Sequence, residues 1–253
     1  MEFVSDDALV IRTQPYGENH RLVLLLTKQW GLLRALAYGA QKQHGPLYGA
    51  TQTLVLSKVL MSLNSNGLSD IKQMEIQTSF PLIRQDPLLL LYATAVNELL
   101  WRLGQVEQQQ QSLPPSVFFE VLACLNKLGQ VSPGLLFTHL ELRLLPFIGV
   151  MIDTTHCAEC GAPLRDTTRF SLAKGGGLCE TCQSGRDDSH AILLLPSTWR
   201  LLGKLVATPL HKLGHVKVSE RYERQLALII RLYLAEYAGV TLRSLQVIES
   251  ENL

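Results

Sequence analysis

The chain has 253 residues, and 23 lysines and arginines against 22 aspartates and glutamates give it a formal net charge of +1. This balance excludes a positive field over the whole molecule that would attract nucleic acid or membrane, so any such binding must come from a local patch. With 47% hydrophobic and 18% charged residues, the chain can bury a sizeable core, which excludes a mainly disordered protein.

The first residues are acidic, whereas a secretory signal begins with basic residues. The most apolar windows are short, and none approaches the roughly 20 residues needed to cross a bilayer. We therefore expect a cytoplasmic protein without a membrane partner. In that reducing compartment, clustered cysteines are more often metal ligands than disulfides.

From Asp7 to about Phe80, short segments of strand-like composition alternate with turn residues. The expected strands cover residues 8–11, 21–27, 32–38, 52–62 and 68–78. Five strands with hairpin signals between several of them predict a small antiparallel barrel over residues 1–80. Periodicity alone leaves a fragment of a β-sandwich open as the alternative.

After Pro81, apolar residues recur at helical spacing. Asp86 and Pro87 predict the start of a helix that continues to Gly104. Later helices are expected at 116–128 and 133–145, from a cap at Ser197–Thr198 to Val206, and from a cap at Ser219 through 220–237 to Gly239. We therefore expect an α+β multidomain protein, in which a mainly helical domain, 81–253, follows the barrel.

Four of the five cysteines form two Cys-x-x-Cys pairs, separated by 18 residues: Cys157, Cys160, Cys179 and Cys182. This spacing is typical of a four-cysteine zinc site, in which two tight turns supply four sulfurs to one ion. The sequence predicts one zinc ion per chain, held in an element at about 154–189. Four protein ligands leave no open position for water, so the site is expected to be structural rather than catalytic.

Other interpretations of this cluster are a redox dithiol, a rubredoxin-type iron centre and chance spacing. A redox pair more often stands alone at the start of a helix. His156 and His190 flank the cluster as spare ligands or as ordinary surface histidines, and Cys124 is expected to be a buried small residue. The glycines after Lys174 favour a turn between the two pairs, since no Gly-Lys-Ser/Thr motif follows. No catalytic motif stands out, so we expect no enzymatic activity.

Two stretches carry candidate nucleic-acid contacts. In the barrel, Arg34, Lys42 and His44 are interleaved with Trp30, Tyr38 and Tyr48, a pattern that suits stacked bases beside a phosphate backbone. The stretch from Arg200 to Arg231 contains seven lysines and arginines but only two glutamates. This second stretch predicts either a phosphate-binding stripe or a solvated helix face. Its candidate contacts are Arg200, Lys204, Lys212, Lys217, Arg221 and Arg224.

Several local motifs then occur in a distinctive order. They are Val96–Leu100, Leu140–Leu145 leading through Ile148–Gly149 into the first cysteine pair, and Leu242–Arg243–Ser244 near the end. With a small barrel first and a four-cysteine element among helices, the chain resembles the RecO family of bacterial DNA repair and recombination mediators over nearly its whole length.

This resemblance implies an OB-fold that binds single- and double-stranded DNA. It also implies annealing of complementary strands, and action with RecR to replace single-strand binding protein by RecA, without enzymatic chemistry. Relatives are rich in Lys and Arg where this chain has Tyr38–Tyr48, and here chiefly Lys42 remains. We expect Arg34, Lys58 and the basic stretch after Arg200 to supply the missing charge. The alternatives are a zinc-stabilised helical adaptor that binds only proteins, and a zinc-ribbon RNA-processing factor.

Overall fold

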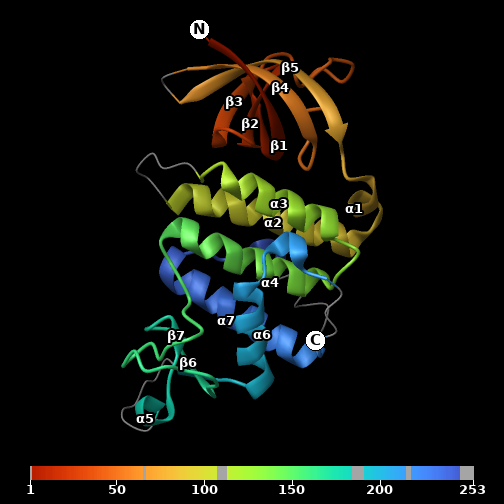
Figure 1. Ribbon diagram of the computed structural model, residues 1–253. Coiled ribbons are helices and arrows are strands. Elements are labelled where there is room, and N and C mark those ends of the chain that lie inside the picture. Colours follow the sequence, from red (N-terminus) through yellow and green to blue (C-terminus); the bar gives the residue numbers. More distant parts are fainter. Residues whose placement is uncertain (1, 65–66, 107–112, 184–190, 215–217, 246–253) are drawn as a thin grey trace. The chain divides into compact units, whose positions relative to one another are not determined.

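The structure is a computed structural model that describes residues 2–64, 67–106, 113–183, 191–214 and 218–245 (Figure 1). The chain forms two compact units: unit 1 comprises Met1–Leu125 and Leu242–Leu253, and unit 2 comprises Asn126–Thr241. The chain therefore leaves unit 1 once and returns to it near the C-terminus. The division at residue 80 expected from composition stays a prediction.

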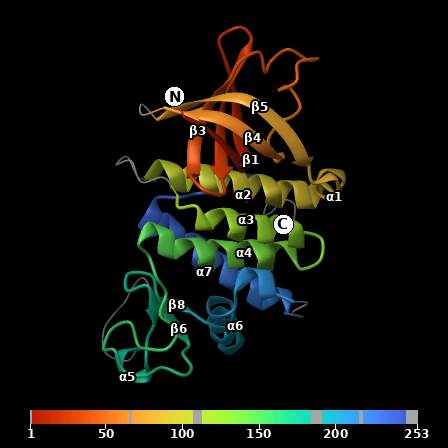
Figure 2. The ribbon, with the colours of Figure 1, turned by 45° about the horizontal axis from the view of Figure 1, so that its top comes forward.

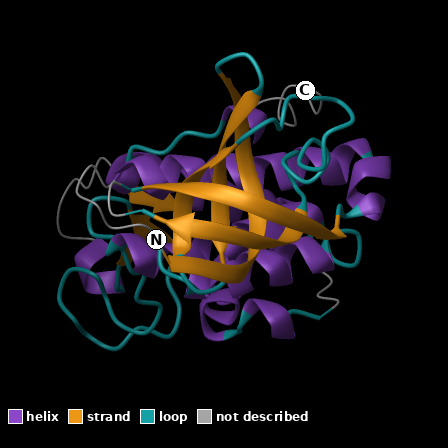
Figure 3. Ribbon diagram, turned by 90° about the horizontal axis from the view of Figure 1, so that it is seen from above, coloured by secondary structure: helices purple, strands orange, loops and turns teal. Residues whose placement is uncertain are grey.

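The first part of unit 1 is a closed barrel of five strands, with the order β1-β2-β3-β5-β4 (Figures 1 and 3). The strands are β1 (Glu2–Tyr16), β2 (His20–Thr27), β3 (Gly31–Ala37), β4 (Leu56–Leu63) and β5 (Leu68–Thr78). β3 and β5 pair in parallel, the other neighbours pair antiparallel, and β4 pairs with β1 to close the barrel. This confirms the five-stranded OB-type barrel, and closure excludes the sandwich fragment. The expectation of a fully antiparallel barrel is wrong at one place, because β3 and β5, which meet there, run in the same direction.

β1 is much longer than the expected strand at 8–11, because its two halves pair with different neighbours. Residues Glu2–Leu9 pair with β4, and Ala8–Tyr16 pair with β2. The polar start of this strand is accommodated because Asp6, though buried, accepts hydrogen bonds from the backbone N–H groups of Asp7 (2.9 Å) and Gln29 (2.8 Å). β4 is shorter than expected, since residues 52–54 lie in turns.

A β-bulge in β1 determines whether the side chains in the second half of this strand point into the barrel or outward. Val10 pairs with Leu25, but Arg12 pairs with the preceding residue of β2, Leu24, so Ile11 is the extra residue. Val10 and Leu25 belong to the barrel core. Because side chains alternate along a strand, the bulge places Arg12 on the outer face beside Leu24 rather than in the interior.

Three helices follow the barrel in the chain, and one of them packs on it. They are α1 (Pro81–Gln85), α2 (Pro87–Val106) and α3 (Ser116–Lys127, extending just past the unit), and α2 contacts β1. The predicted cap is confirmed, since Asp86 Oδ1 accepts from the N–H groups of Leu88 and Leu89. Close approach needs glycine here: a Cβ on Gly104 would lie 2.4 Å from the Leu32 side chain.

The segment that returns from unit 2 is fastened to α2. Glu98 accepts hydrogen bonds from Arg243 N (3.1 Å), Ser244 N (2.9 Å) and Ser244 Oγ (2.7 Å). Leu242 and Leu245 on either side are buried. Two sequence motifs almost 150 residues apart thus form the two halves of one contact.

Unit 2 contains helices and a small cysteine-bearing element (Figure 2). Its helices are α4 (Pro133–Leu144), η1 (Leu145–Ile148), α5 (Glu180–Gln183), α6 (Pro196–Ala207), η2 (Leu210–Lys212) and α7 (Glu220–Ala238), and its strands are β6 (Arg169–Ser171), β7 (Gly176–Gly177) and β8 (Ala191–Leu193). α4 packs against α6 and α7 and is buried along most of its length, including Glu141.

The expected cap of α6 is wrong, whereas that of α7 is right in position. α6 begins at Pro196 after Leu195, because the Thr198 hydroxyl instead donates to Gln225 Oε1 (2.7 Å). Ser219 does occupy the cap position of α7, but its side chain makes no capping hydrogen bond. Within the described residues, no helix combines the length and apolar character needed to span a membrane.

Candidate metal centre and nucleic-acid interface

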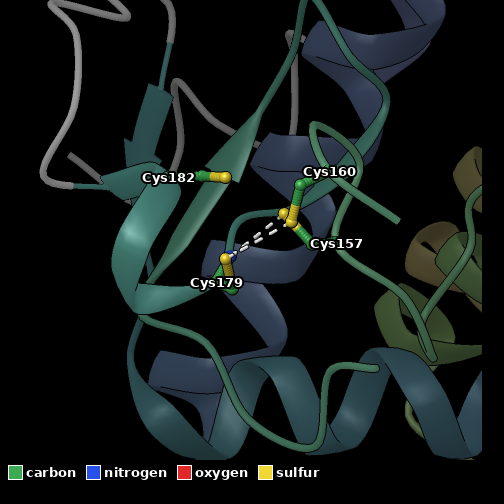
Figure 4. A group of neighbouring side chains, drawn as sticks. All are labelled: Cys157, Cys160, Cys179 and Cys182. Atoms are coloured by element: carbon green, nitrogen blue, oxygen red, sulfur yellow. Dashed lines mark hydrogen bonds between the residues drawn. The ribbon is translucent and has the colours of Figure 1, made fainter. Parts of the chain in front are cut away.

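The four cysteines predicted as ligands come together in unit 2 (Figure 4). Their Sγ atoms all lie within 4.8 Å of one another, and those of Cys160 and Cys179 are 3.7 Å apart. Four sulfurs at about 2.3 Å from one tetrahedral ion would stand about 3.8 Å apart. The cluster can therefore hold a metal ion with little rearrangement.

Backbone hydrogen bonds shape the first cysteine pair as a tight turn. Cys157 N donates to Ala162 O (2.8 Å), and Gly161 N donates to Cys157 O (2.9 Å). Gly161 has φ +72°, a left-handed conformation that is unfavourable for residues with a side chain. The second pair begins directly before α5 and turns its Cys179 N–H toward Cys157 Sγ (3.3 Å; Figure 4).

The sulfurs strongly affect one another's ionisation. Burial acts to raise the pKa of Cys157, but hydrogen bonds from the backbone N–H groups of Cys160, Cys179 and Glu159 outweigh it and lower the pKa to about 6. Hydrogen bonds with Cys179 and Cys160 raise the pKa of Cys182 to about 12. Four thiolates this close repel one another, so the fully ionised set that a metal site uses needs a cation to balance it.

The surroundings fix the position of this element in unit 2. A Cβ on Gly177 would lie 2.7 Å from Trp199 and 2.8 Å from Leu164, so the glycine run is a packing requirement. Gly175 has φ +69° and supplies the predicted turn between the pairs. His156 pairs with Asp153 (3.0 Å) and is not in the sulfur cluster, and His190 lies outside the described residues.

One end of the barrel gathers part of the predicted nucleic-acid contacts. Tyr38, one of the predicted rings, is about half exposed there, and so is Tyr16, which the sequence did not suggest as a contact. His20 makes an edge contact with Tyr38. Lys42 and His44 are exposed in the following loop. The start of that loop is fixed, because Gln41 donates its backbone N–H to Asn19 O (3.0 Å) and its side-chain amide to His20 O (2.8 Å).

Other barrel candidates do not join this end. Trp30 precedes β3 and Tyr38 follows it, so the two rings are separated by about 23 Å of strand. Arg34 is exposed in the middle of β3, on the outer face. Lys58 is exposed on β4, but its partners across the ladder are Asp7 and Glu75.

The basic stretch of unit 2 is partly neutralised. Arg200 pairs with Asp166 (2.8 Å), and Arg224 pairs with Glu220. Lys204, Lys212 and Arg221 are exposed. Lys217 lies outside the described residues. The structure thus spreads this stretch over α6, η2 and α7, with acidic partners for two of its members.

The sequence did not indicate a role for Arg21, which holds the far end of the barrel loop that contains Lys42 and His44. Its guanidinium donates to Tyr48 O and Thr51 Oγ1 (both 2.9 Å) and stacks on the Tyr48 ring, 4.7 Å from its centroid. No sequence signal marks this role, because the partners are about 30 residues away along the chain. Tyr48 is consequently a structural support rather than a free stacking surface.

Fold and site together define a class of protein: a small OB-type barrel followed by helices and by a four-cysteine cluster that can hold a metal ion. Residues 1–80 match the family model described as "Recombination protein O N terminal", and residues 84–246 match "Recombination protein O C terminal". The chain belongs to the RecO family, whose role is in DNA repair and recombination.

Individual relatives agree over nearly the full length. The DNA repair protein RecO of Bacillus subtilis (strain 168) is 31% identical over 239 residues, covering 94% of this chain and 91% of the relative. The protein of the same name from Exiguobacterium sibiricum is 30% identical over 243 residues, covering 96% and 95%. That of Shouchella clausii is 31% identical over 242 residues, covering 94% and 91%.

Proposed function

We propose that this protein is a non-enzymatic mediator of DNA repair that binds single- and double-stranded DNA and anneals complementary strands. With RecR, it helps to load RecA onto strands covered by single-strand binding protein, in the bacterial cytoplasm near the nucleoid. Family membership across the chain supports this proposal. The observation that carries it is the barrel end at which exposed Tyr16 and Tyr38 adjoin the loop of Lys42 and His44.

This barrel end has the chemistry that single-stranded DNA needs. Bases stack on aromatic rings without regard to sequence, while cations follow the phosphates. Because Gln41 and Arg21 fix the ends of the loop, little order has to be gained on binding. With few cations available, binding should be weak at high salt and strengthened by partner proteins.

The test is a titration of a labelled single-stranded oligonucleotide with the full chain at several salt concentrations. Lys42→Ala and Arg34→Ala, singly and together, should weaken binding. Removing one cation that binds a phosphate should reduce the slope of log K against log salt by about 0.7. Lys28→Ala is the matched control, because this exposed lysine pairs with Asp7 (3.6 Å). An unchanged slope in the double variant contradicts the assignment of the barrel.

The same oligonucleotide separates the mediator from a protein-only adaptor. A mediator shifts single-stranded DNA in a gel at low salt and accelerates the pairing of complementary strands. With RecR added, it should also restore RecA assembly on DNA coated with single-strand binding protein. A chain that binds RecR but no DNA would be the adaptor, and preference for RNA would indicate an RNA-processing factor.

We further propose that the metal is zinc, one ion per chain, with a structural role. Four thiolates in a closed tetrahedral set are the preferred environment of Zn²⁺. Elemental analysis of the purified protein should give about one zinc per chain. Iron, or no metal in freshly purified protein, would contradict this proposal.

A further inference from the structure

Two arginines lie on the outer face of the barrel, away from the exposed rings at its end, and a third lies on α2, which contacts the barrel strand β1. They come from β1, β3 and α2: Arg12, Arg34 and Arg102. We propose that these residues, with Trp101, form a phosphate-binding track that carries the DNA backbone from the barrel onto α2. This inference rests on the proposed DNA binding and adds a second contact region to it.

The barrel ladder sets the spacing of the first two arginines. Arg12 on β1 pairs with Leu24 on β2, and Leu24 pairs with Arg34 on β3. Facing Cα atoms on neighbouring strands are about 5 Å apart, so the two arginine Cα atoms lie about 10 Å apart in one row. Both side chains are exposed. Only the bulge at Ile11 brings Arg12 into this row, because regular alternation would point it into the barrel.

Trp101 links this row to α2. The guanidinium carbon of Arg12 lies 4.1 Å from the centroid of the Trp101 ring, and that of Arg102 lies 4.9 Å from it. Stacking on the ring fixes the plane of a guanidinium while its N–H donors stay at the edge, where a phosphate oxygen can accept two of them. The arginines are thus held in place before a ligand arrives, which reduces the entropy cost of binding.

The nearby acids leave a positive excess. Arg102 Nη2 is 3.6 Å from Glu98 Oε1, longer than a hydrogen bond, and Glu98 already accepts three hydrogen bonds from Arg243 and Ser244. Within the described part of the chain, no ion pair joins Arg12 to a carboxylate. Two stacked arginines and one acid, Glu98, leave a net positive charge here, which suits a phosphate group.

The alternative is that this cluster only packs α2 against the barrel. Both possibilities predict a loss of stability when Trp101 is removed, but only the phosphate track predicts a change in the salt dependence of DNA binding. The variant Arg12→Lys also separates the two possibilities, because lysine keeps the positive charge of Arg12 but loses the planar stacking on Trp101.

The experiment uses the full chain and the single-stranded oligonucleotide titration. Arg12→Ala should reduce the salt slope by about 0.7, so that between about 50 and 200 mM salt the affinity of the wild type falls about 2.6-fold more than that of the variant. Arg12→Lys should restore the slope, and Arg102→Ala should reproduce the reduced slope. Lys28→Ala is again the control, since this exposed lysine pairs with Asp7 (3.6 Å).

A second readout follows the tryptophan itself. Adding DNA should change the emission of the wild type, and this component should disappear in Trp101→Phe. If Arg12→Ala and Arg102→Ala keep the wild-type slope while Lys42→Ala lowers it, the phosphate track is wrong and the proposed function stands. If the wild type binds no DNA at any salt concentration, the proposed function itself fails.

Discussion

Replacing Glu141 by glutamine should remove a pH dependence from the stability of unit 2. Glu141 lies on α4 with no exposed surface, and neither carboxylate oxygen has a hydrogen-bond partner within the described residues. Burial raises the pKa of Glu141 to about 8, although the charge of Arg231 acts to lower it. The folded protein therefore holds this proton at neutral pH.

The sign follows from proton binding. Between the ordinary pKa of 4.5 and the folded pKa of about 8, the unfolded chain has released the proton while the folded protein keeps it. Stability contributed by this group is complete below pH 4.5 and falls as the pH rises through this window, by about 1.4 kcal/mol per pH unit. From pH 4.5 to about pH 7 the decrease is about 3 kcal/mol.

Urea unfolding followed by circular dichroism measures this effect. The free energy of unfolding of Glu141→Gln minus that of the wild type should increase by about 3 kcal/mol from acid to neutral pH, since glutamine has no proton to lose. Glu236→Gln, at an exposed position on α7, should follow the wild type at every pH. A difference between Glu141→Gln and wild type that stays constant with pH would show that Glu141 is ionised in the folded protein and that Arg231 compensates it.

Three further substitutions test packing, fastening and metal binding. Gly31→Ala should cost at least about 2 kcal/mol in thermal unfolding, because Gly31 has φ +69° and a Cβ there would meet Leu113 O at 2.0 Å; wild-type stability would contradict that packing. Glu98→Gln should cost about 1–2 kcal/mol and expose the segment around Ser244 to proteolysis, whereas unchanged cleavage would mean that Glu98 does not hold it. Cys157→Ser should lower the melting temperature and the metal content together, and chelation of the wild type should do the same; a metal-free protein of full stability would exclude a structural ion.

The barrel and the cysteine cluster were predictable because both depend on local signals. Turn residues between apolar segments predicted five strands, and the two Cys-x-x-Cys pairs predicted four converging sulfurs. The length of β1 was not predictable, since Asp6 fits a strand only because Gln29 donates to its carboxylate. The cap predicted for α6 was wrong for the same reason, a contact between residues far apart in the sequence. The Thr198 hydroxyl donates to Gln225 on another helix and does not cap α6.

The nucleic-acid candidates show a different limit. Interleaving of rings and cations in sequence suggested one surface, yet β3 separates Trp30 from Tyr38 by its full length. Arg12 was overlooked, because alternation along β1 would turn it inward and only the bulge turns it outward. A bulge inserts one residue without a composition signal, so sequence patterns near it assign side chains to the wrong face.

The fastening of Leu242–Leu245 to α2 also has a consequence for synthesis of the chain. The barrel and α2 leave the ribosome first, but the residues that bond to Glu98 follow only after all of unit 2 has been translated. Glu98 and the apolar surface around it must wait more than 100 residues for their partners, at roughly 5–20 residues per second. We expect unit 1 to complete its native structure only late, so truncated nascent chains should expose this surface to chaperones.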